Sequence, residues 1–371
     1  MPEINGERVL ADLRALKALA PFESGVHRPT LSPEHVASLK WLETELRAIG
    51  HEAKIDGIAN VFGISKVTGP KLLGGSHLES QNHAGWLDGP LGVVYALEAA
   101  RAVKADPAFT NCGVDVVACC DEEGHYGFFL GSRSAVGEVN DALIDGAVDR
   151  TSGIPMRDAL AAAGLAGVPR HVIDPKRYVG FLEAHIEQGD WLEANDLKIG
   201  VVTGIVGIRQ YVITTAAVPN HAGTTRMAIR KDAGVAAARI AVAISDQFPA
   251  LAGERTVWTM GRITLEPGAP AVIPGRAELV LQMRDADNAV LDRLEGKVRE
   301  IVAEADKSGP CRAAIRQTRR TEPAAMAPHF MDAVRGAAEA DVPGRHVDMP
   351  SGAGNDAMVF SRHMPSGMLF V

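Results

Sequence analysis

The stretch VDVVACCDEEG, residues 114–124, decides how this chain is expected to fold. Its first seven residues form an apolar run, which predicts a strand buried in the interior of a sheet. The strand leads straight into three acids, Asp121, Glu122 and Glu123, whose charges repel one another and resist desolvation. Cations or a solvated turn would relieve that repulsion, and these residues alone leave both explanations open.

The residues before this strand alternate between helix and strand patterns. Ser32 and Pro33 are typical of a helix start, and apolar residues then recur at helical spacing, which predicts a helix over 32–50. Two strands and a second helix are predicted at 59–66, 71–76 and 90–104. This alternation predicts an α/β fold with a mainly parallel sheet, in which chemistry gathers at the carboxyl ends of the strands.

The pattern changes at about residue 207. The segments that follow predict the order βαββαβ, which is typical of a small two-layer domain. Their expected ranges are 208–217, 230–246, 255–264, 276–284, 288–306 and 311–318. We therefore expect a discontinuous first domain over 1–206 and 319–371, with a second domain inserted over 207–318.

The composition excludes several classes of protein. The 371 residues carry a net charge of −8, which argues against a polyanionic partner such as nucleic acid. No apolar run approaches the roughly 20 residues of a membrane-spanning helix. The start, MPEINGERVLADL, has acids where a secretory signal needs basic and apolar regions, so a cytoplasmic location is expected. The cysteines lack a Cys-x-x-Cys pattern and are expected to be buried small hydrophobic side chains.

Besides the three acids, three short segments hold side chains that commonly bind metals. They are GGSHLESQNHAGWLDGPLG (74–92), EAHIEQG (183–189) and PNHAGTT (219–225). His77 ends a predicted strand, and Glu79, two residues later, could hold its imidazole. Asp88 lies among glycines, which allow the tight turn that brings a carboxylate onto a metal.

Each segment also has an ordinary explanation. A lone histidine is usually a surface residue or a satisfied core residue. Glu183, His185 and Glu187 alternate with apolar residues, and the two glutamates alone would fit an exposed strand face. Taken together, imidazoles and carboxylates at strand ends favour a hard or borderline metal ion in a cleft. The residues therefore favour a metal-dependent hydrolase.

The same residues resemble the M20 family of metallo-amidohydrolases, above all its N-carbamoyl-L-amino acid hydrolases, β-ureidopropionases and allantoate amidohydrolases. The resemblance runs along essentially the whole chain. The motifs that carry it are GVHRPTLSP (25–33), GIAN (57–60), GSH (75–77), LDG (87–89), DEEG (121–124), LGSR (130–133), HIEQG (185–189), EPGAP (266–270), VIPG (272–275) and MPSGAG (349–354).

The resemblance implies two divalent metal ions per subunit. Their ligands would be His77, Asp88, Glu123 and His185, with Asp88 bridging the two ions. Zinc, manganese, cobalt and nickel all suit such a mixed shell of imidazole and carboxylate. Glu122 would be the general acid/base that takes a proton from water and returns it to the leaving nitrogen.

The resemblance also implies substrate contacts and an assembly. His221 would be a catalytic residue that stabilises a developing oxyanion. Gln188, Arg284 and Asn355 would bind the substrate, with Arg284 clamping a carboxylate. The first domain would be the metal-binding catalytic domain and the inserted one the dimerisation domain, which implies a homodimer.

The implied activity is hydrolysis of an amide or ureido C–N bond in a small carboxylate substrate, such as an N-carbamoyl-L-amino acid. Two alternatives stay open. One is an aminoacylase or aminopeptidase of the same family, which would share the metal chemistry. The other is a catalytically inactive binding protein with the same fold.

Four features depart from the family pattern. Ala271 stands where relatives have Asn, Asn355 where many have His, and Arg226 where Pro is common. The first two changes alter the hydrogen-bond donors offered to a substrate, which argues against an ordinary N-carbamoyl amino acid. In relatives a later loop supplies a His to the second metal, so we expect the protein to extend beyond Val371.

Overall fold

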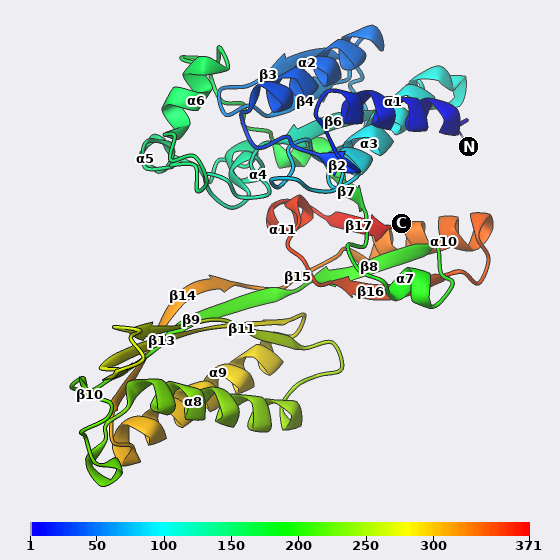
Figure 1. Ribbon diagram of the computed structural model, residues 1–371. Helices are drawn as coiled ribbons and strands as arrows, with labels where there is room; N and C mark the ends of the chain where they lie inside the picture. The colour runs from blue at the N-terminus through cyan, green and yellow to red at the C-terminus, as the bar shows by residue number, and fades with distance from the viewer. Residues whose placement is uncertain (1) are drawn as a thin grey trace. The chain divides into compact units, whose positions relative to one another are not determined.

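Figure 1 shows a computed structural model of the protein, which describes residues 2–371. The chain divides into two compact units. The first unit comprises the residues up to Thr203 together with Ala325–Val371, and the inserted unit comprises Gly204–Ala324. Each unit buries a hydrophobic core of its own, as separate domains do.

The first unit is built on a mixed sheet with a parallel centre. Within residues 2–371 its strand order is β15-β8-β17-β7-β5-β6-β4-β3, and β16 pairs with β8. The central strands β17, β7, β5 and β6 run parallel to one another, whereas β4 and β3 continue the sheet in antiparallel pairing. The prediction of an α/β fold with a mainly parallel central sheet is confirmed. The strands are β3 (Glu52–Ile55), β4 (Val61–Ile64), β5 (Lys71–His77), β6 (Gly113–Cys119), β7 (Tyr178–His185), β8 (Ile199–Ile205), β15 (Ala324–Ala325), β16 (His346–Ser351) and β17 (Ser366–Phe370).

Local sequence signals explain the helices that pack on this sheet. Helix α2 (Pro33–Ala48) begins where predicted, because Ser32 accepts a hydrogen bond from the backbone N–H of His35. Its apolar face, which includes Leu42, is buried in the core and contacts β3 and β4. Helix α3 (Pro90–Ala105) packs on β5 and β6 and contacts α1. The remaining elements of this unit are α1 (Gly6–Ala18), β1 (Pro21–Phe22), β2 (Gly25–Val26), α4 (Leu130–Ala135), α5 (Asp141–Asp145), α6 (Met156–Ala162), α7 (Trp191–Ala194), α10 (Pro328–Asp341) and α11 (Asp356–Phe360).

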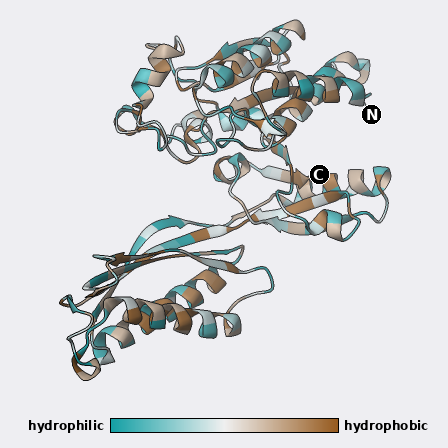
Figure 2. Cartoon of the chain, viewed as in Figure 1, coloured by the Kyte–Doolittle hydropathy of each residue, from teal (hydrophilic) through white to brown (hydrophobic). Residues whose placement is uncertain are grey.

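The inserted unit is a two-layer structure of sheet and helices. Its strands follow the order β11-β13-β9-β14 and are all antiparallel. Helices α8 and α9 cover one face of this sheet (Figure 1), and the side chains between the layers form the core. Figure 2 shows hydrophobic and hydrophilic stretches on both helices, as expected for helices with one buried face. The elements are β9 (Gly207–Ala216), β10 (Asn220–His221), α8 (Ala233–Gln247), β11 (Val257–Glu266), β12 (Val272–Ile273), β13 (Arg276–Asp285), α9 (Asn288–Ser308) and β14 (Arg312–Thr321).

No helix within residues 2–371 combines the length and the apolar character that crossing a membrane requires.

Candidate metal centre and active site

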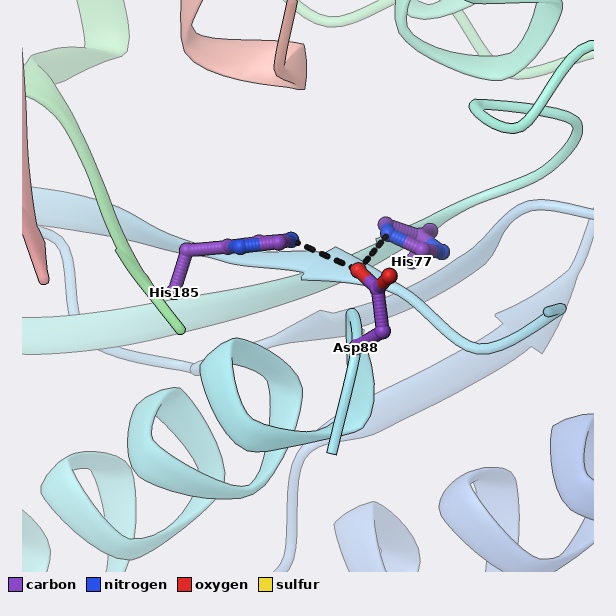
Figure 3. A group of neighbouring side chains, drawn as sticks. All are labelled: His77, Asp88 and His185. Atoms are coloured by element: carbon purple, nitrogen blue, oxygen red, sulfur yellow. Dashed lines mark ion pairs between the residues drawn. The ribbon is translucent and has the colours of Figure 1, made fainter. Parts of the chain in front are cut away.

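Three side chains predicted as metal ligands converge in the first unit. His77 is the last residue of β5 and His185 the last residue of the neighbouring strand β7, so both lie at the carboxyl edge of the parallel sheet. Asp88 precedes α3, and its carboxylate lies between the two imidazoles (Figure 3). One ligand atom from each residue lies within 4.8 Å of the others. This is the spacing that a shared metal ion requires.

The hydrogen bonds of both imidazoles leave the nitrogens that face Asp88 free to bind a cation. Nδ1 of His77 lies 3.0 Å from the carbonyl oxygen of Glu79, and Nδ1 of His185 lies 2.9 Å from the carbonyl oxygen of Ile186. A carbonyl only accepts, so in the neutral ring Nδ1 carries the hydrogen and Nε2 carries a lone pair. Both Nε2 atoms face Oδ1 of Asp88, at 3.7 Å and 3.2 Å. Lone pairs that face a carboxylate oxygen repel it unless a proton or a metal ion lies between them.

The ionisation of these groups supports the same conclusion. Burial lowers the pKa of His185, but its hydrogen bond to Asp88 and the charge of Glu183 outweigh this and raise it to about 9. Burial raises the pKa of Asp88, but His185 and His77 outweigh that effect and hold it below its usual value. These pKa values indicate that the site attracts positive charge. In addition, Nε2 of His77 is buried and has no hydrogen-bond partner among the described residues. The donors fit a divalent metal of the zinc or manganese type.

Glu122, the predicted acid/base residue, lies beside this cluster. Its Oε2 atom is 3.8 Å from Nε2 of His77, and its side chain is only 10% exposed. Burial, together with the charges of Asp356, Glu123 and Glu183, raises its pKa well above the ordinary glutamate value. A carboxyl with a raised pKa can hold a proton and release it near neutral pH, as general acid/base catalysis requires.

Glu123 does not join the three clustered ligands in this structure. Its carboxylate accepts hydrogen bonds from the backbone N–H and the side-chain amide of Gln81, at 3.1 Å and 3.0 Å. Its binding of a second metal ion stays a prediction. Gln188, by contrast, lies at the cluster, because its amide donates to Oδ2 of Asp88.

Two sequence-based expectations about neighbouring carboxylates are wrong. The carboxylate of Glu79 was expected to hold the ring of His77, but the backbone carbonyl of Glu79 does so, and the carboxylate lies 3.8 Å away. Glu187 was expected to share a strand face with His185, but β7 ends at His185. Glu187 instead accepts the backbone N–H groups of Trp191 and Leu192 at the start of α7.

Sequence reasoning missed a further buried carboxyl group near the site. Asp356, at the start of α11, is fully buried, and neither of its oxygens has a hydrogen-bond partner within residues 2–371. Burial raises its pKa, although His77 opposes this. Asn355, predicted to contact the substrate, is also buried and accepts a hydrogen bond from Ser351. The position of Asp356 after a glycine-rich motif was the available signal, but a single acid in such a motif does not indicate burial.

The two remaining candidates belong to the inserted unit. His221 is exposed, and its Nδ1 accepts the backbone N–H groups of Gly223 and Thr224 at 3.0 Å and 3.2 Å. In the neutral ring Nε2 then carries the hydrogen, which is the form that can donate to an oxyanion. Arg284 is partly buried, which lowers its pKa, and its Nε donates to Gln282.

Comparison with known proteins adds a family and a set of relatives. The family model described as "Peptidase family M20/M25/M40" matches residues 70–371. An N-carbamoyl-L-amino-acid amidohydrolase of Paenarthrobacter aurescens is 33% identical over 381 residues, covering 100% of this chain and 91% of the relative. An allantoate amidohydrolase of Escherichia coli (strain K12) is 32% identical over 357 residues, covering 94% of this chain and 85% of the relative.

Solved structures are also similar along the whole chain. A crystal structure of an amidase of the hydantoinase/carbamoylase family from Burkholderia phymatum has a TM-score of 0.95 and 44% sequence identity, covering 100% of this chain and 92% of that one. The similarity therefore includes both units.

Proposed function

This chain belongs to peptidase family M20/M25/M40, and we propose that it is a metal-dependent amidohydrolase that cleaves an amide or ureido C–N bond of a small carboxylate substrate. One observation carries the proposal. The Nε2 atoms of His77 and His185 face the same carboxylate oxygen of Asp88, with the nearly buried Glu122 beside them. This arrangement suits a cation and a proton-transferring residue at one place. The names of the relatives favour a ureido or N-carbamoyl substrate.

We propose that His77, Asp88 and His185 hold a divalent metal ion and that Glu123 contributes to a second. Zinc, manganese, cobalt and nickel are the candidates, since each accepts imidazole and carboxylate ligands. Bound metal would supply Lewis acidity, which lowers the pKa of water and polarises the scissile carbonyl. Glu122 would take the proton from the attacking water and deliver it to the leaving nitrogen.

The residues that we propose for substrate binding are inferred from the resemblance to the M20 family. Gln188 and Asn355 in the first unit are proposed to contact the substrate. In the inserted unit, Arg284 would bind a substrate carboxylate, since a guanidinium offers paired donors to it, and His221 would stabilise the oxyanion.

We also propose a homodimer formed through the inserted unit. Strand β11 is an edge strand of its sheet and exposes apolar side chains such as Val257 and Ile263. Exposed edge strands tend to pair with another chain. Light scattering in solution that gave the mass of a single chain at micromolar concentration would contradict this proposal.

The function is tested by screening metal-loaded protein against N-carbamoyl amino acids, allantoate and other ureides, N-acyl amino acids and dipeptides. Release of ammonia from a ureido compound is the expected result, and release of two amino acids from a dipeptide would favour an aminopeptidase instead. Glu122→Gln is the control, since it keeps the size of the side chain but cannot accept the proton. Equal activity of this variant and the parent would exclude the proposed role of Glu122.

A further inference from the structure

We propose that His35 is a positioning residue that holds the carboxylate of Glu79 against the backbone N–H of Glu122. The inference rests on the proposed function, because it concerns the orientation of the proposed acid/base residue. His35 lies in the first turn of α2, 87 residues before Glu122 in the sequence. Neither the sequence motifs nor the metal cluster assigns it a role.

Glu79 connects His35 to Glu122 through its two carboxylate oxygens. Oε1 accepts the backbone N–H of Glu122 at 2.6 Å. Oε2 lies 3.6 Å from Nε2 of His35, and both side chains have no solvent exposure. Neither of these two atoms has a hydrogen-bond partner among the described residues. A buried donor or acceptor without a hydrogen bond costs free energy. A small movement that brings Nε2 of His35 to Oε2 of Glu79 would therefore stabilise the site.

The tautomer of His35 is set by the backbone. The N–H of Leu31 donates to Nδ1 of His35 at 3.0 Å, so Nδ1 carries the lone pair and Nε2 carries the hydrogen. Leu31 adopts φ of +62°, a left-handed conformation that is unusual for leucine and persists where the surroundings require it. Burial, helped by the charge of Arg28, lowers the pKa of His35 to about 3, which keeps the ring neutral. His35 therefore presents a fixed N–H to Oε2 of Glu79, which lies 3.6 Å from it.

The neighbouring motif GVHRPTLSP (25–33) contacts residues next to Glu79 and Glu122. Arg28 is fully buried, its backbone N–H donates to Ser80 Oγ at 3.1 Å, and its guanidinium donates to the carbonyl of Leu78. Thr30 donates to Oδ1 of Asp121 at 3.0 Å. The motif thus contacts the residues that follow His77 and the residue that precedes Glu122. This gives a physical role to a segment that the proposed chemistry does not use directly.

The test compares substitutions at His35 with a matched control just beyond the carboxyl end of α2. His35→Phe keeps a ring but removes the donor, and His35→Gln can return a donor to the position of Nε2. His51 is also a buried histidine, and its Nε2 contacts the carbonyl of Val114 at 2.9 Å, so His51→Phe removes a comparable contact elsewhere. We expect His35→Phe to lower kcat about 10- to 100-fold with KM changed less than about twofold, as loss of an outer-shell contact typically does. We expect His35→Gln to recover most of the loss and His51→Phe to keep the parental kcat.

A second readout requires neither metal nor activity. In the metal-free protein, hydrogen exchange of the Glu122 amide should be slow, and His35→Phe should accelerate it at least about tenfold while His51→Phe does not. If His35→Phe does not fold, Glu79→Gln makes the same test, because the amide replaces one of the two oxygens that face Glu122 and His35 with an NH2 group, which only donates. Parental kcat and parental exchange at Glu122 in these variants would overturn the proposal. If the parent hydrolyses none of the compounds in the substrate screen, the proposed function is wrong. The hydrogen-exchange measurement would still test the role of His35.

Discussion

Replacing Gly89 with alanine should disturb the metal centre without removing any of its side chains. Gly89 directly follows Asp88 and has φ of +85°. A Cβ atom at this position would lie 2.5 Å from Nδ1 and Cε1 of His77 and 2.6 Å from its carbonyl oxygen. Ordinary van der Waals contact begins at 3.4 Å, so the ring of His77 or the loop that carries Asp88 must move by about 0.9 Å.

This displacement sets the expected size of the effect. The positive φ alone costs an alanine ~1–2 kcal/mol of stability. A displacement near 1 Å in a catalytic arrangement costs on the order of 10²-fold in rate. We therefore expect Gly89→Ala to lower kcat/KM about 100-fold and to weaken metal binding about 10- to 100-fold.

Gly153→Ala is the matched control for this substitution. Gly153 also has a left-handed φ, +74°, but a Cβ atom there would meet nothing within 4 Å. It should show the conformational cost in urea unfolding without a change in the metal centre. Calorimetric titration of metal-free protein and release of ammonia from the best substrate measure the two effects. Equal metal affinities for Gly89→Ala and Gly153→Ala would refute the reasoning.

Three further predictions test the site and the core. Added zinc or manganese should raise the melting temperature of the metal-free protein, since a ligand that binds only the folded state stabilises it. Asp88→Ala should abolish this rise in melting temperature. A rise of parental size in that variant would exclude Asp88 as a ligand. Burial raises the pKa of Asp56 from 3.8 to about 6, so the folded protein binds a proton at this carboxyl more readily than the unfolded chain does. The charged carboxylate therefore lowers the free energy of unfolding by about 3 kcal/mol, and this penalty is relieved as pH falls from about 6 to 4. The free energy of unfolding of the parent relative to Asp56→Asn should therefore increase over that range, and a difference that fell or stayed constant would contradict this sign. Leu42→Ala should lower the free energy of unfolding by about 2–5 kcal/mol in urea titration, because Leu42 is fully buried, while kcat of the folded variant should equal that of the parent.

The sequence by itself determined the elements whose signals are local. Helix α2 begins after Ser32 because its cap and its proline act on the first turn alone. Strand β6 forms where a short apolar run precedes three acids, and in the inserted unit α9 follows its helical apolar spacing. The alternation of strands and helices was sufficient to predict the parallel sheet. It also indicated that the candidate functional residues lie at the carboxyl ends of its strands.

The tertiary structure decided which polar groups face one another. Carbonyl groups of Glu79 and Ile186 set the tautomers of the two histidines, and the backbone N–H and side-chain amide of Gln81 hold the carboxylate of Glu123. The burial of Asp356 likewise has no counterpart in its local sequence.

The pairing of His35 with Glu79 shows the physical reason for this division. Their contact joins segments 44 residues apart and depends on the direction of single hydrogen bonds, one of them from the left-handed Leu31. Helix caps and hydrophobic periodicity act over a few neighbouring residues, so they can be read along the chain. Burial, tautomer and charge at the site arise only when distant segments exclude water from one another, so these properties were decided by the folded structure.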